Sequence, residues 1–154
     1  MMKEHNKLAI QIEAYNSGLT KEQIEFTQNI LLDGGVIIYP TDTIYGIGCD
    51  ITNTDAIRRV LDIKGRDANK PMSFVCADLR HIKNYAHVSE KREKLLEKFL
   101  PGPYTFVLPA SSQAPKELLT EQKTVGLRIP DHKIPLSIVN ALKKPLLSTS
   151  ANFS

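Results

Sequence analysis

The stretch from Thr20 to Ile51, TKEQIEFTQNILLDGGVIIYPTDTIYGIGCDI, passes from a helical pattern into two strand-like runs. Thr20 and Gln23 have the spacing of a capping box, which predicts a helix that begins just after Thr20. The pair Gly34 and Gly35 predicts its end, because glycine readily adopts the left-handed conformation that closes a helix. This segment therefore predicts a helix that feeds directly into a sheet.

The two strand-like runs are VIIYP (36–40) and IYGIGCDI (44–51). The first is apolar and ended by proline, which is typical of a buried strand where it leaves a sheet. Further helical patterns are TNTDAIRRVLDIKG (52–65), SEKREKLLEKFL (89–100) and PLSIVNALK (135–143), and further strand patterns are PMSFVCA (71–77), YTFVLP (104–109), TVGLRIP (124–130) and PLLSTSA (145–151). This alternation predicts an α/β or α+β fold, with helices packed against a mixed sheet.

The helical patterns also predict which side chains are buried. In the helix within 52–65, the apolar face carries Ala56, Ile57, Val60 and Leu61, and Gly65 follows as a C-terminal cap. In the charged helix within 89–100, we expect Leu95, Leu96 and Phe99 to form the buried stripe.

The composition is that of an ordinary soluble protein, with 42% hydrophobic and 24% charged residues. A chain of 154 residues can form a single domain with a substantial core. No apolar run reaches the length of a membrane helix, and the segment MMKEHNKLAI lacks the pattern of a secretory signal. We therefore expect a cytoplasmic protein that does not engage a membrane.

Cysteine and histidine spacing gives no sign of a metal site. Cys49 and Cys76 fit no CxxC pattern and lie in apolar runs, so we expect buried free thiols. The histidines show neither HxxxH nor HExxH spacing and are interpreted as surface or loop residues: His5, His81, His87 and His132. The formal net charge of +3 does not require a nucleic-acid partner, although it is compatible with anionic ligands.

The segment KGRDANKP (64–71) concentrates positive charge, with Lys64, Arg66 and Lys70 close together around a glycine. A helix C-terminus attracts one or two cations on structural grounds alone. A third cation is harder to explain, because like charges repel unless an anion or an acid neutralises them. Phosphate would suit the segment, since arginine binds its oxygens in a fork and lysine acts as a point charge.

Polar side chains gather where four predicted strands end, in PTDTIYG (40–46), PGPYT (101–105), GLRIP (126–130) and STSAN (148–152). Taken singly, each has a structural explanation, such as a turn cap, an ion pair or a polar loop. Together with the basic segment, they indicate a site that binds anions and positions reactants. The sequence has no GxxxxGK[ST] or GxGxxG motif, and no set of residues typical of nucleophilic catalysis.

The spacing K-x-R-x(3)-K-P at 64–71, preceded by PTDTIYGIG and followed by PGPYT, GLRIP and STSANFS, resembles the YrdC family of threonylcarbamoyl-AMP synthases. The resemblance runs from Thr20 to Ser154. It implies a twisted mixed sheet flanked by helices around a basic concave cavity. It also implies an enzyme that makes L-threonylcarbamoyladenylate from L-threonine, bicarbonate or CO2, and ATP, releasing pyrophosphate. The product would pass to downstream tRNA-modification proteins for threonylcarbamoyladenosine formation.

The resemblance also implies roles for residues at the matching positions. Lys64 and Arg66 would hold the ATP phosphates as the catalytic cations, with Lys70 beside them, and Ser150 and Asn152 would contact the nucleotide. The threonine and carbamate end would be lined by Thr41, Thr43, Tyr45, Thr105, Arg128 and Ser148. Magnesium would arrive on the triphosphate, which fits a chain with no protein-built metal site.

The family pattern continues beyond S-A-N-x-S, so residues 1–154 are expected to be one YrdC-like domain that lacks its last elements.

Two alternatives remain open, namely another branch of the family and another function. The runs PMSFVCADL and TVGLRIP also resemble the YciO branch, whose K-x-R and S-x-N motifs are weaker. The rival function is a module that binds double-stranded RNA or tRNA without synthase activity, using charges such as those of KREKLLEK (91–98). In that helix, interleaved Glu93 and Glu97 favour a solvated surface instead.

Overall fold

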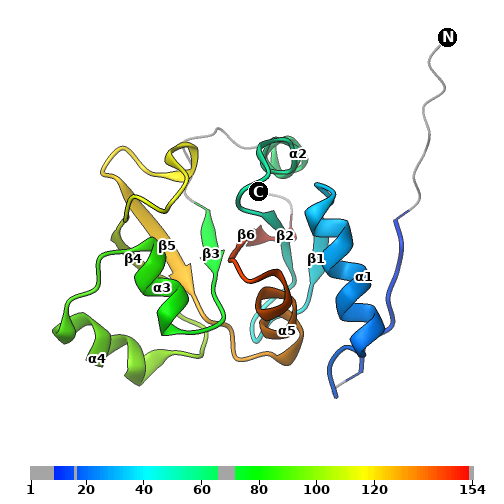
Figure 1. Ribbon diagram of the computed structural model, residues 1–154, viewed down its shortest axis with the longest axis horizontal. Coiled ribbons are helices and arrows are strands. Elements are labelled where there is room, and N and C mark those ends of the chain that lie inside the picture. Colours follow the sequence, from blue (N-terminus) through cyan, green and yellow to red (C-terminus); the bar gives the residue numbers. More distant parts are fainter. Residues whose placement is uncertain (1–8, 16, 66–71, 153–154) are drawn as a thin grey trace, which may run out of the picture.

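The computed structural model describes residues 9–15, 17–65 and 72–152. Its centre is a six-stranded sheet with the order β1-β2-β6-β3-β5-β4 (Figure 1). The strands are β1 (Ile37–Tyr39), β2 (Gly46–Asp50), β3 (Ser73–Val75), β4 (Phe106–Pro109), β5 (Thr124–Arg128) and β6 (Leu146–Ser150). The pairing of β3 with β5 is parallel and the other pairings are antiparallel. The predicted mixed sheet is therefore confirmed.

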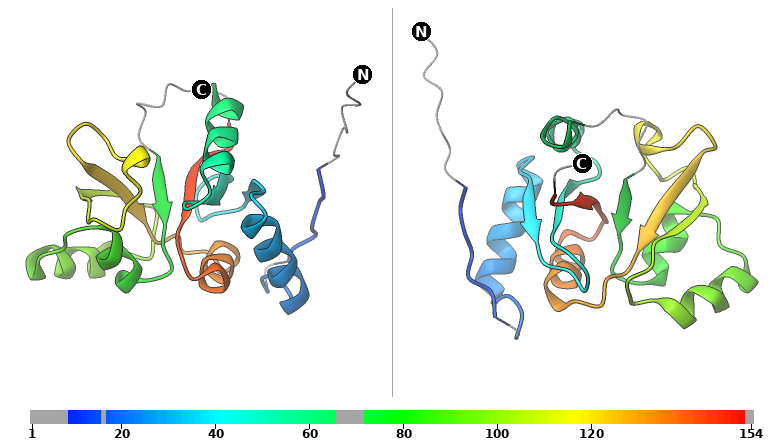
Figure 2. Two further views of the ribbon diagram at one scale, coloured as in Figure 1. Left: turned by 45° about the horizontal axis from the view of Figure 1, so that its top comes forward. Right: turned by 180° about the vertical axis from the view of Figure 1, so that it is seen from behind.

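Helices cover the sheet in two groups. The helices are α1 (Lys21–Leu32), α2 (Thr54–Lys64), α3 (Leu79–Tyr85), α4 (Glu90–Phe99) and α5 (Lys133–Leu142), with a short 3-10 helix at Lys116–Leu118. Helices α1 and α5 lie side by side and share one apolar cluster with the sheet (Figures 1 and 2). Side chains from α2, α3 and α4 join a second cluster. The sheet thus carries an apolar layer on each face.

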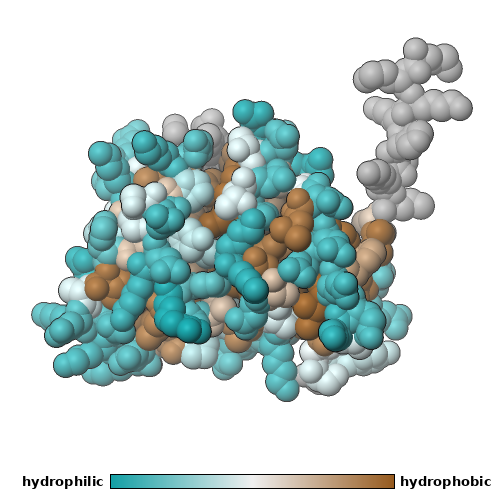
Figure 3. Space-filling view, in the orientation of Figure 1, coloured by the Kyte–Doolittle hydropathy of each residue, from teal (hydrophilic) through white to brown (hydrophobic). Residues whose placement is uncertain are grey.

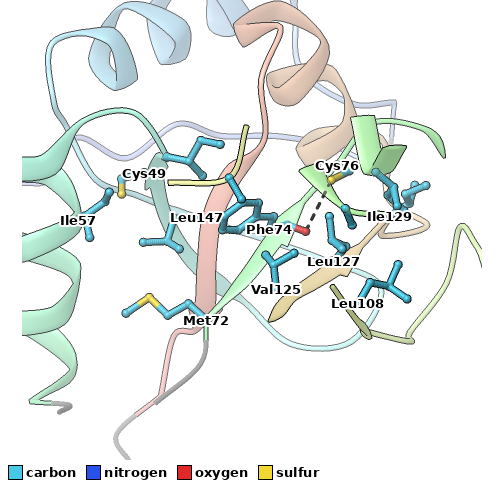
Figure 4. Packing of buried hydrophobic residues seen from close by; sticks show 14 of the residues in the cluster. Cys49, Ile57, Met72, Phe74, Cys76, Leu108, Val125, Leu127, Ile129 and Leu147 are labelled. Atoms are coloured by element: carbon cyan, nitrogen blue, oxygen red, sulfur yellow. Dashed lines mark hydrogen bonds between the residues drawn. The ribbon is translucent and has the colours of Figure 1, made fainter. Parts of the chain in front are cut away.

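The larger cluster centres on Phe74 of β3, which lies among side chains of neighbouring strands, including Leu127 and Leu147 (Figure 4). Cys49 and Cys76 belong to the same cluster and are buried free thiols, as predicted. Burial raises the pKa of both thiols, that of Cys49 to about 12. Both cysteines therefore stay protonated at neutral pH and behave as small apolar side chains.

Helix α1 begins as the sequence predicts. The Thr20 side chain accepts a hydrogen bond from the Gln23 backbone N–H, and the Gln23 side chain accepts one from the Thr20 backbone N–H. Two amide groups that would otherwise lack an intrahelical partner are thereby satisfied. Helix α2 likewise ends at Gly65, whose φ of 56° lies in the left-handed region.

Because Thr20 caps α1, we expect Thr20→Ala to lower the free energy of unfolding by about 1 kcal/mol. The effect should reach the whole domain, since α1 packs against α5 and the sheet. Urea unfolding followed by circular dichroism measures it. Glu25→Ala, an exposed change in the same helix, serves as the control and should shift the value by less than about 0.5 kcal/mol. Equal effects of the two changes would contradict the capping role.

The structure corrects two expectations about burial. The strand within VIIYP is an edge strand rather than a buried one, because β1 pairs with β2 at the end of the sheet, and Ile38 is 65% exposed. In α4 only Leu96 of the expected stripe is buried, whereas Leu95 is 47% and Phe99 is 41% exposed. Phe99 instead makes edge contacts with Tyr104. Periodicity identified the helix, but the width of its buried face depends on how much of the sheet lies beneath it.

Helix α3 was not predicted from the sequence. It has only 7 residues, and its segment LRHIKNY mixes charged and apolar side chains without a clear period. Asp78 begins it, since the Asp78 carboxylate accepts a hydrogen bond from the His81 backbone N–H.

Hydrophilic side chains cover most of the face seen in Figure 3, with apolar residues showing in separate patches between them. Within the described ranges, no helix combines the length and the apolar character that crossing a membrane requires.

Candidate functional site

A row of small residues crosses four neighbouring strands. Gly48 of β2 pairs with Ser148 of β6, Ser148 pairs with Ser73 of β3, and Ser73 pairs with Gly126 of β5. Side chains of paired residues lie on the same face of a sheet, so this row places only glycine and short serine side chains on that face. A Cβ atom at Gly126 would lie 3.2 Å from Thr105 Cγ2 and 3.3 Å from the Ser73 hydroxyl. Of this row, Ser73 and Ser148 line a cavity, whereas the ring of Tyr39 packs over Gly48.

A cavity of about 170 Å³ lies over this end of the sheet. It is lined by Thr41, Thr43, Ile44, Tyr45, Gly46, Ser73, Val75, Thr105, Arg128, Pro130, Ser148, Thr149 and Ser150. All six residues predicted for the threonine and carbamate end belong to this lining, and so does Ser150. Segments that are distant in sequence therefore meet at one place, although Thr105 lies just before β4 rather than at the end of a strand.

Among the described residues that line this cavity, Arg128 at the end of β5 is the cation. Its Nη2 donates to the Asp42 carboxylate and to Thr43 Oγ1, the latter at 3.0 Å, and its Nε donates to Gly102 O at 3.4 Å. The Arg128 and Asp42 side chains are only 16% and 13% exposed. The guanidinium is consequently held on one edge by three groups, in a partly dry environment where electrostatic forces are strong.

The loop between β1 and β2 shapes the adjoining wall. Thr41 Oγ1 donates to Ile44 O at 2.6 Å and accepts from the Thr43 backbone N–H at 3.1 Å. The hydroxyls of Thr41 and Thr43 also lie within hydrogen-bond distance of each other, at 3.1 Å. These short-range bonds fix the turn, so its hydroxyl groups face the cavity from a defined backbone.

Tyr39 packs beside Ser148 on the same face of the sheet, over Gly46 and Gly48. It is 2% exposed, and its hydroxyl lies 2.5 Å from Ser148 Oγ. Burial raises the pKa of Tyr39 to about 12, while the Ser148 hydrogen bond and the charge of Arg128 act in the opposite direction. Gly46 accommodates the ring, because a Cβ atom there would lie 2.9 Å from Tyr39 Cζ. Tyr39 therefore stays protonated at neutral pH and holds the Ser148 hydroxyl in place.

These protonation states predict a loss of stability in alkali. The pKa of Tyr39 rises from 10.0 to about 12 on folding and that of Cys49 from 9.0 to about 12. These two groups contribute fully to the free energy of unfolding at pH values below their pKa in the unfolded state. The contribution is lost as pH rises through their pKa in the folded state, because the folded state holds these protons more tightly. Urea unfolding at about pH 8 and about pH 10.5 should show the decline. Tyr39→Phe should flatten it above about pH 10, and an unchanged slope would contradict the assignment.

Lys64, the last residue of α2, joins this helix to the end of β6. Although only 9% exposed, it reaches the polar groups beyond the strand: Nζ donates to Ser150 O at 2.9 Å, to Asn152 O, and to Asn152 Oδ1 at 3.3 Å. The Ser150 hydroxyl also donates to Asn152 Oδ1. Lys64, Ser150 and Asn152 thus form one connected group, which adjoins the cavity through Ser150.

Two predicted site residues, Arg66 and Lys70, lie outside the described residues. Among other residues of the site, Asp42 and Thr149 lie in the predicted polar segments but received no role, whereas Ser73 and Tyr39 were missed. Ser73 and Thr149 line the cavity, Asp42 pairs with Arg128, and Tyr39 supports Ser148. Ser73 had a usable signal, because it is a polar residue on one face of an otherwise apolar strand. The place of Tyr39 depends on a partner 109 positions away, which no local pattern reveals.

A second hollow, of about 570 Å³, lies between α3 and the end of α5 and contains none of the predicted residues. Two of its cations already have carboxylate partners, since Arg80 pairs with Asp78 at 2.9 Å and Lys83 pairs with Glu93. The smaller cavity is the better candidate for a binding site, because predicted residues line it and none lines the second hollow. Across the described residues, no group of three His, Cys, Asp or Glu side chains is placed to hold a metal ion.

Comparison with known proteins gives an independent view of this arrangement. A sequence model named Sua5, YciO and YrdC, with the description "telomere recombination", matches residues 29–154. That range contains every residue of the cavity lining and the Lys64 group.

Three similar proteins illustrate the match. A threonylcarbamoyl-AMP synthase of Vibrio vulnificus is 37% identical over 80% of this chain and 68% of its own length. The crystal structure of E. coli YciO matches with a TM-score of 0.80 and 34% identity, over 84% of this chain and 64% of YciO. That of P. abyssi Sua5 complexed with L-threonine matches with a TM-score of 0.82 and 31% identity, over 88% of this chain and 40% of Sua5. The chain spans 59% of the length of the curated YciO sequence from E. coli.

Proposed function

The chain belongs to the Sua5/YciO/YrdC family, and we propose that it acts as an L-threonylcarbamoyl-AMP synthase. The substrates would be L-threonine, bicarbonate or CO2, and ATP, and the products threonylcarbamoyl-AMP and pyrophosphate. The main support is the cavity itself. It combines Arg128 with hydroxyl groups from the β1–β2 loop, the start of β3, the residue before β4, and β6, next to the turn at Ser150 and Asn152 that Lys64 binds.

The chemistry needs positioning and charge more than a protein nucleophile. The neutral amine of threonine attacks CO2, loses a proton and becomes a carbamate. A carbamate oxygen then attacks the α-phosphorus of ATP, and pyrophosphate leaves with the electron pair of the broken P–O bond. Because carbamate and triphosphate are both anions, the site must offset their repulsion and stabilise the charge that builds on phosphorus.

The cavity residues that were predicted to bind threonine and carbamate suit a small polar zwitterion. Arg128 would bind the carboxylate of threonine, since a guanidinium matches a carboxylate in geometry and charge. The hydroxyls of Thr41, Thr43, Thr105 and Ser148, with Tyr45 at the rim, would orient the amine and the side-chain hydroxyl. The P. abyssi Sua5 structure complexed with L-threonine supports threonine as the amino acid.

The nucleotide would lie toward Lys64, with Ser150 and Asn152 contacting it and Arg66 and Lys70 completing the phosphate site. Lys64 would exchange its contact with Asn152 Oδ1, a long hydrogen bond of 3.3 Å, for a phosphate oxygen. Magnesium carried by the triphosphate would neutralise part of its charge. The adenylate would then pass to proteins that modify tRNA.

Pyrophosphate release from ATP tests this function. We expect release that depends on both L-threonine and bicarbonate, and a product that contains both the amino acid and AMP. Omitting either L-threonine or bicarbonate should reduce the rate to background. Release that is indifferent to L-threonine would contradict the proposal.

The RNA-binding alternative would require a broad field of phosphate contacts. The cations of α4 do not form such a field, because acids alternate with them and Glu93 is paired with Lys83 of α3. Filter binding of double-stranded RNA at several salt concentrations distinguishes the two functions. Tight, salt-dependent binding without ATP turnover would favour the RNA-binding module.

A further inference from the structure

Asp42 pairs with Arg128, the arginine among the described residues of the cavity lining. It follows Thr41 in the loop after β1 and accepts a hydrogen bond from Arg128 Nη2, across 86 positions of sequence. Both side chains are largely buried, at 13% and 16% exposure. The charge of Arg128 is therefore balanced within the protein rather than by solvent ions.

The contacts leave part of the guanidinium for a ligand. Nε and Nη2 donate to Gly102, Asp42 and Thr43. Among the described residues, Nη1 donates to no acceptor. Since Arg128 lines the cavity and Asp42 is absent from the lining, the acid lies on the protein side of the arginine. An anion that binds Nη1 would consequently feel the attraction of Arg128 and, slightly farther away, the repulsion of Asp42.

The position of Asp42 is unfavourable for the stability of the fold. Its Oδ2 is buried and has no hydrogen-bond partner within the described part of the chain. An unpaired buried carboxylate oxygen is unfavourable, and buried ion pairs in general add little to stability compared with apolar side chains. Such a residue is more readily explained by what its charge does in the cavity than by what it does for folding.

We propose that Asp42 is a specificity-determining residue, which makes the cavity select an amino-acid zwitterion over a simple anion. This rests on the proposed function, in which the cavity takes L-threonine. The carboxylate of a zwitterion pairs with Arg128, and its ammonium group is attracted by Asp42. A ligand that carries only the carboxylate receives the repulsion without that compensation. The distinction matters here, because the same cavity must meet bicarbonate and ATP, which would otherwise compete for Arg128.

Asp42→Asn tests the proposal, since it keeps the shape of the side chain and an oxygen acceptor for Arg128 but removes the charge. The probes are L-threonine and 3-hydroxybutyrate, which has the same carboxylate and hydroxyl groups but hydrogen in place of the ammonium. Titration calorimetry measures both affinities. We expect Asp42→Asn to bind 3-hydroxybutyrate at least about 10-fold more tightly than the wild type does, and to discriminate about 10-fold less between the two probes.

Two further variants sharpen the test. Asp42→Glu keeps the charge and should restore most of the discrimination. Asp78→Asn is the matched control, because Asp78 also pairs with an arginine, Arg80, but lies outside the cavity lining. It should leave both affinities unchanged. Thermal melting verifies that each variant is folded.

The outcomes separate this inference from the proposed function. Unchanged affinity of folded Asp42→Asn for 3-hydroxybutyrate, or equal shifts in Asp78→Asn, would overturn the role of Asp42 while leaving a synthase intact. If the wild type releases no pyrophosphate but Asp42→Asn still tightens 3-hydroxybutyrate, the synthase assignment fails and charge balancing by Asp42 stands.

Discussion

Lys64→Met is expected to slow pyrophosphate release by about 100- to 1000-fold, the range found when one group that stabilises transition-state charge is removed. Lys64 is the described cation nearest to the turn at Ser150 and Asn152, and methionine keeps the length of the side chain while removing its charge. The charge that builds on the α-phosphate would lose a stabilising partner. A quenched-flow or coupled pyrophosphate assay at saturating substrates measures the loss.

The same change also removes a structural contact. Ser150 O and the two oxygens of Asn152 would lose a charged donor, so part of the effect could come from a displaced turn. Thermal melting and the affinity for L-threonine separate the two causes, because Lys64 does not belong to the cavity lining proposed to bind L-threonine. Lys91→Met, an exposed change in α4, is the matched control and should keep the wild-type rate. A folded Lys64→Met protein within about 3-fold of the wild-type rate would remove Lys64 from the proposed chemistry.

Arg128→Ala should weaken L-threonine binding by about 10- to 100-fold, the value of one charged hydrogen-bonded contact. It should also lower the free energy of unfolding by about 3–5 kcal/mol, because it leaves the buried Asp42 carboxylate without its partner. Titration calorimetry measures the first effect and urea unfolding the second.

A double change distinguishes binding from stability. Asp42→Asn combined with Arg128→Ala removes both charges, so the free energy of unfolding should recover by more than half relative to Arg128→Ala alone. Binding of L-threonine should stay weak, since no guanidinium remains to bind the carboxylate. If the double variant regains the wild-type affinity, Arg128 acts only by supporting the fold.

The local elements of this protein could be read from its sequence because their causes are local. The Thr20 and Gln23 pair begins α1 through bonds that span three residues, and Gly65 ends α2 through its own backbone conformation. The apolar face of α2 was also predictable, since Ala56, Ile57 and Val60 recur with the helical period and are buried. Burial in α4 was not predictable, because it depends on how much of the sheet lies beneath the helix.

Most of the candidate site could also be predicted from the sequence. The signal was the polar side chains next to apolar strand-like runs, because a strand does not need them in order to form. Thr41, Thr43, Thr105, Arg128 and Ser148 all line the cavity. What the sequence could not supply was their partners. Asp42 appeared as one more polar loop residue, and Tyr39 as the end of a strand, until the fold placed them against Arg128 and Ser148.

By itself, therefore, the sequence determined the caps of α1 and α2, the approximate positions of the predicted helices and strands, and which residue types were available for chemistry. The tertiary structure decided that β6 lies between β2 and β3, and this order brings Ser148 beside Gly48 and Ser73 at the cavity. It also decided that the charge of Arg128 is balanced by Asp42, 86 positions away. The physical reason is that capping and periodicity act over a few residues, whereas a cavity and its charge depend on the order and register of distant strands.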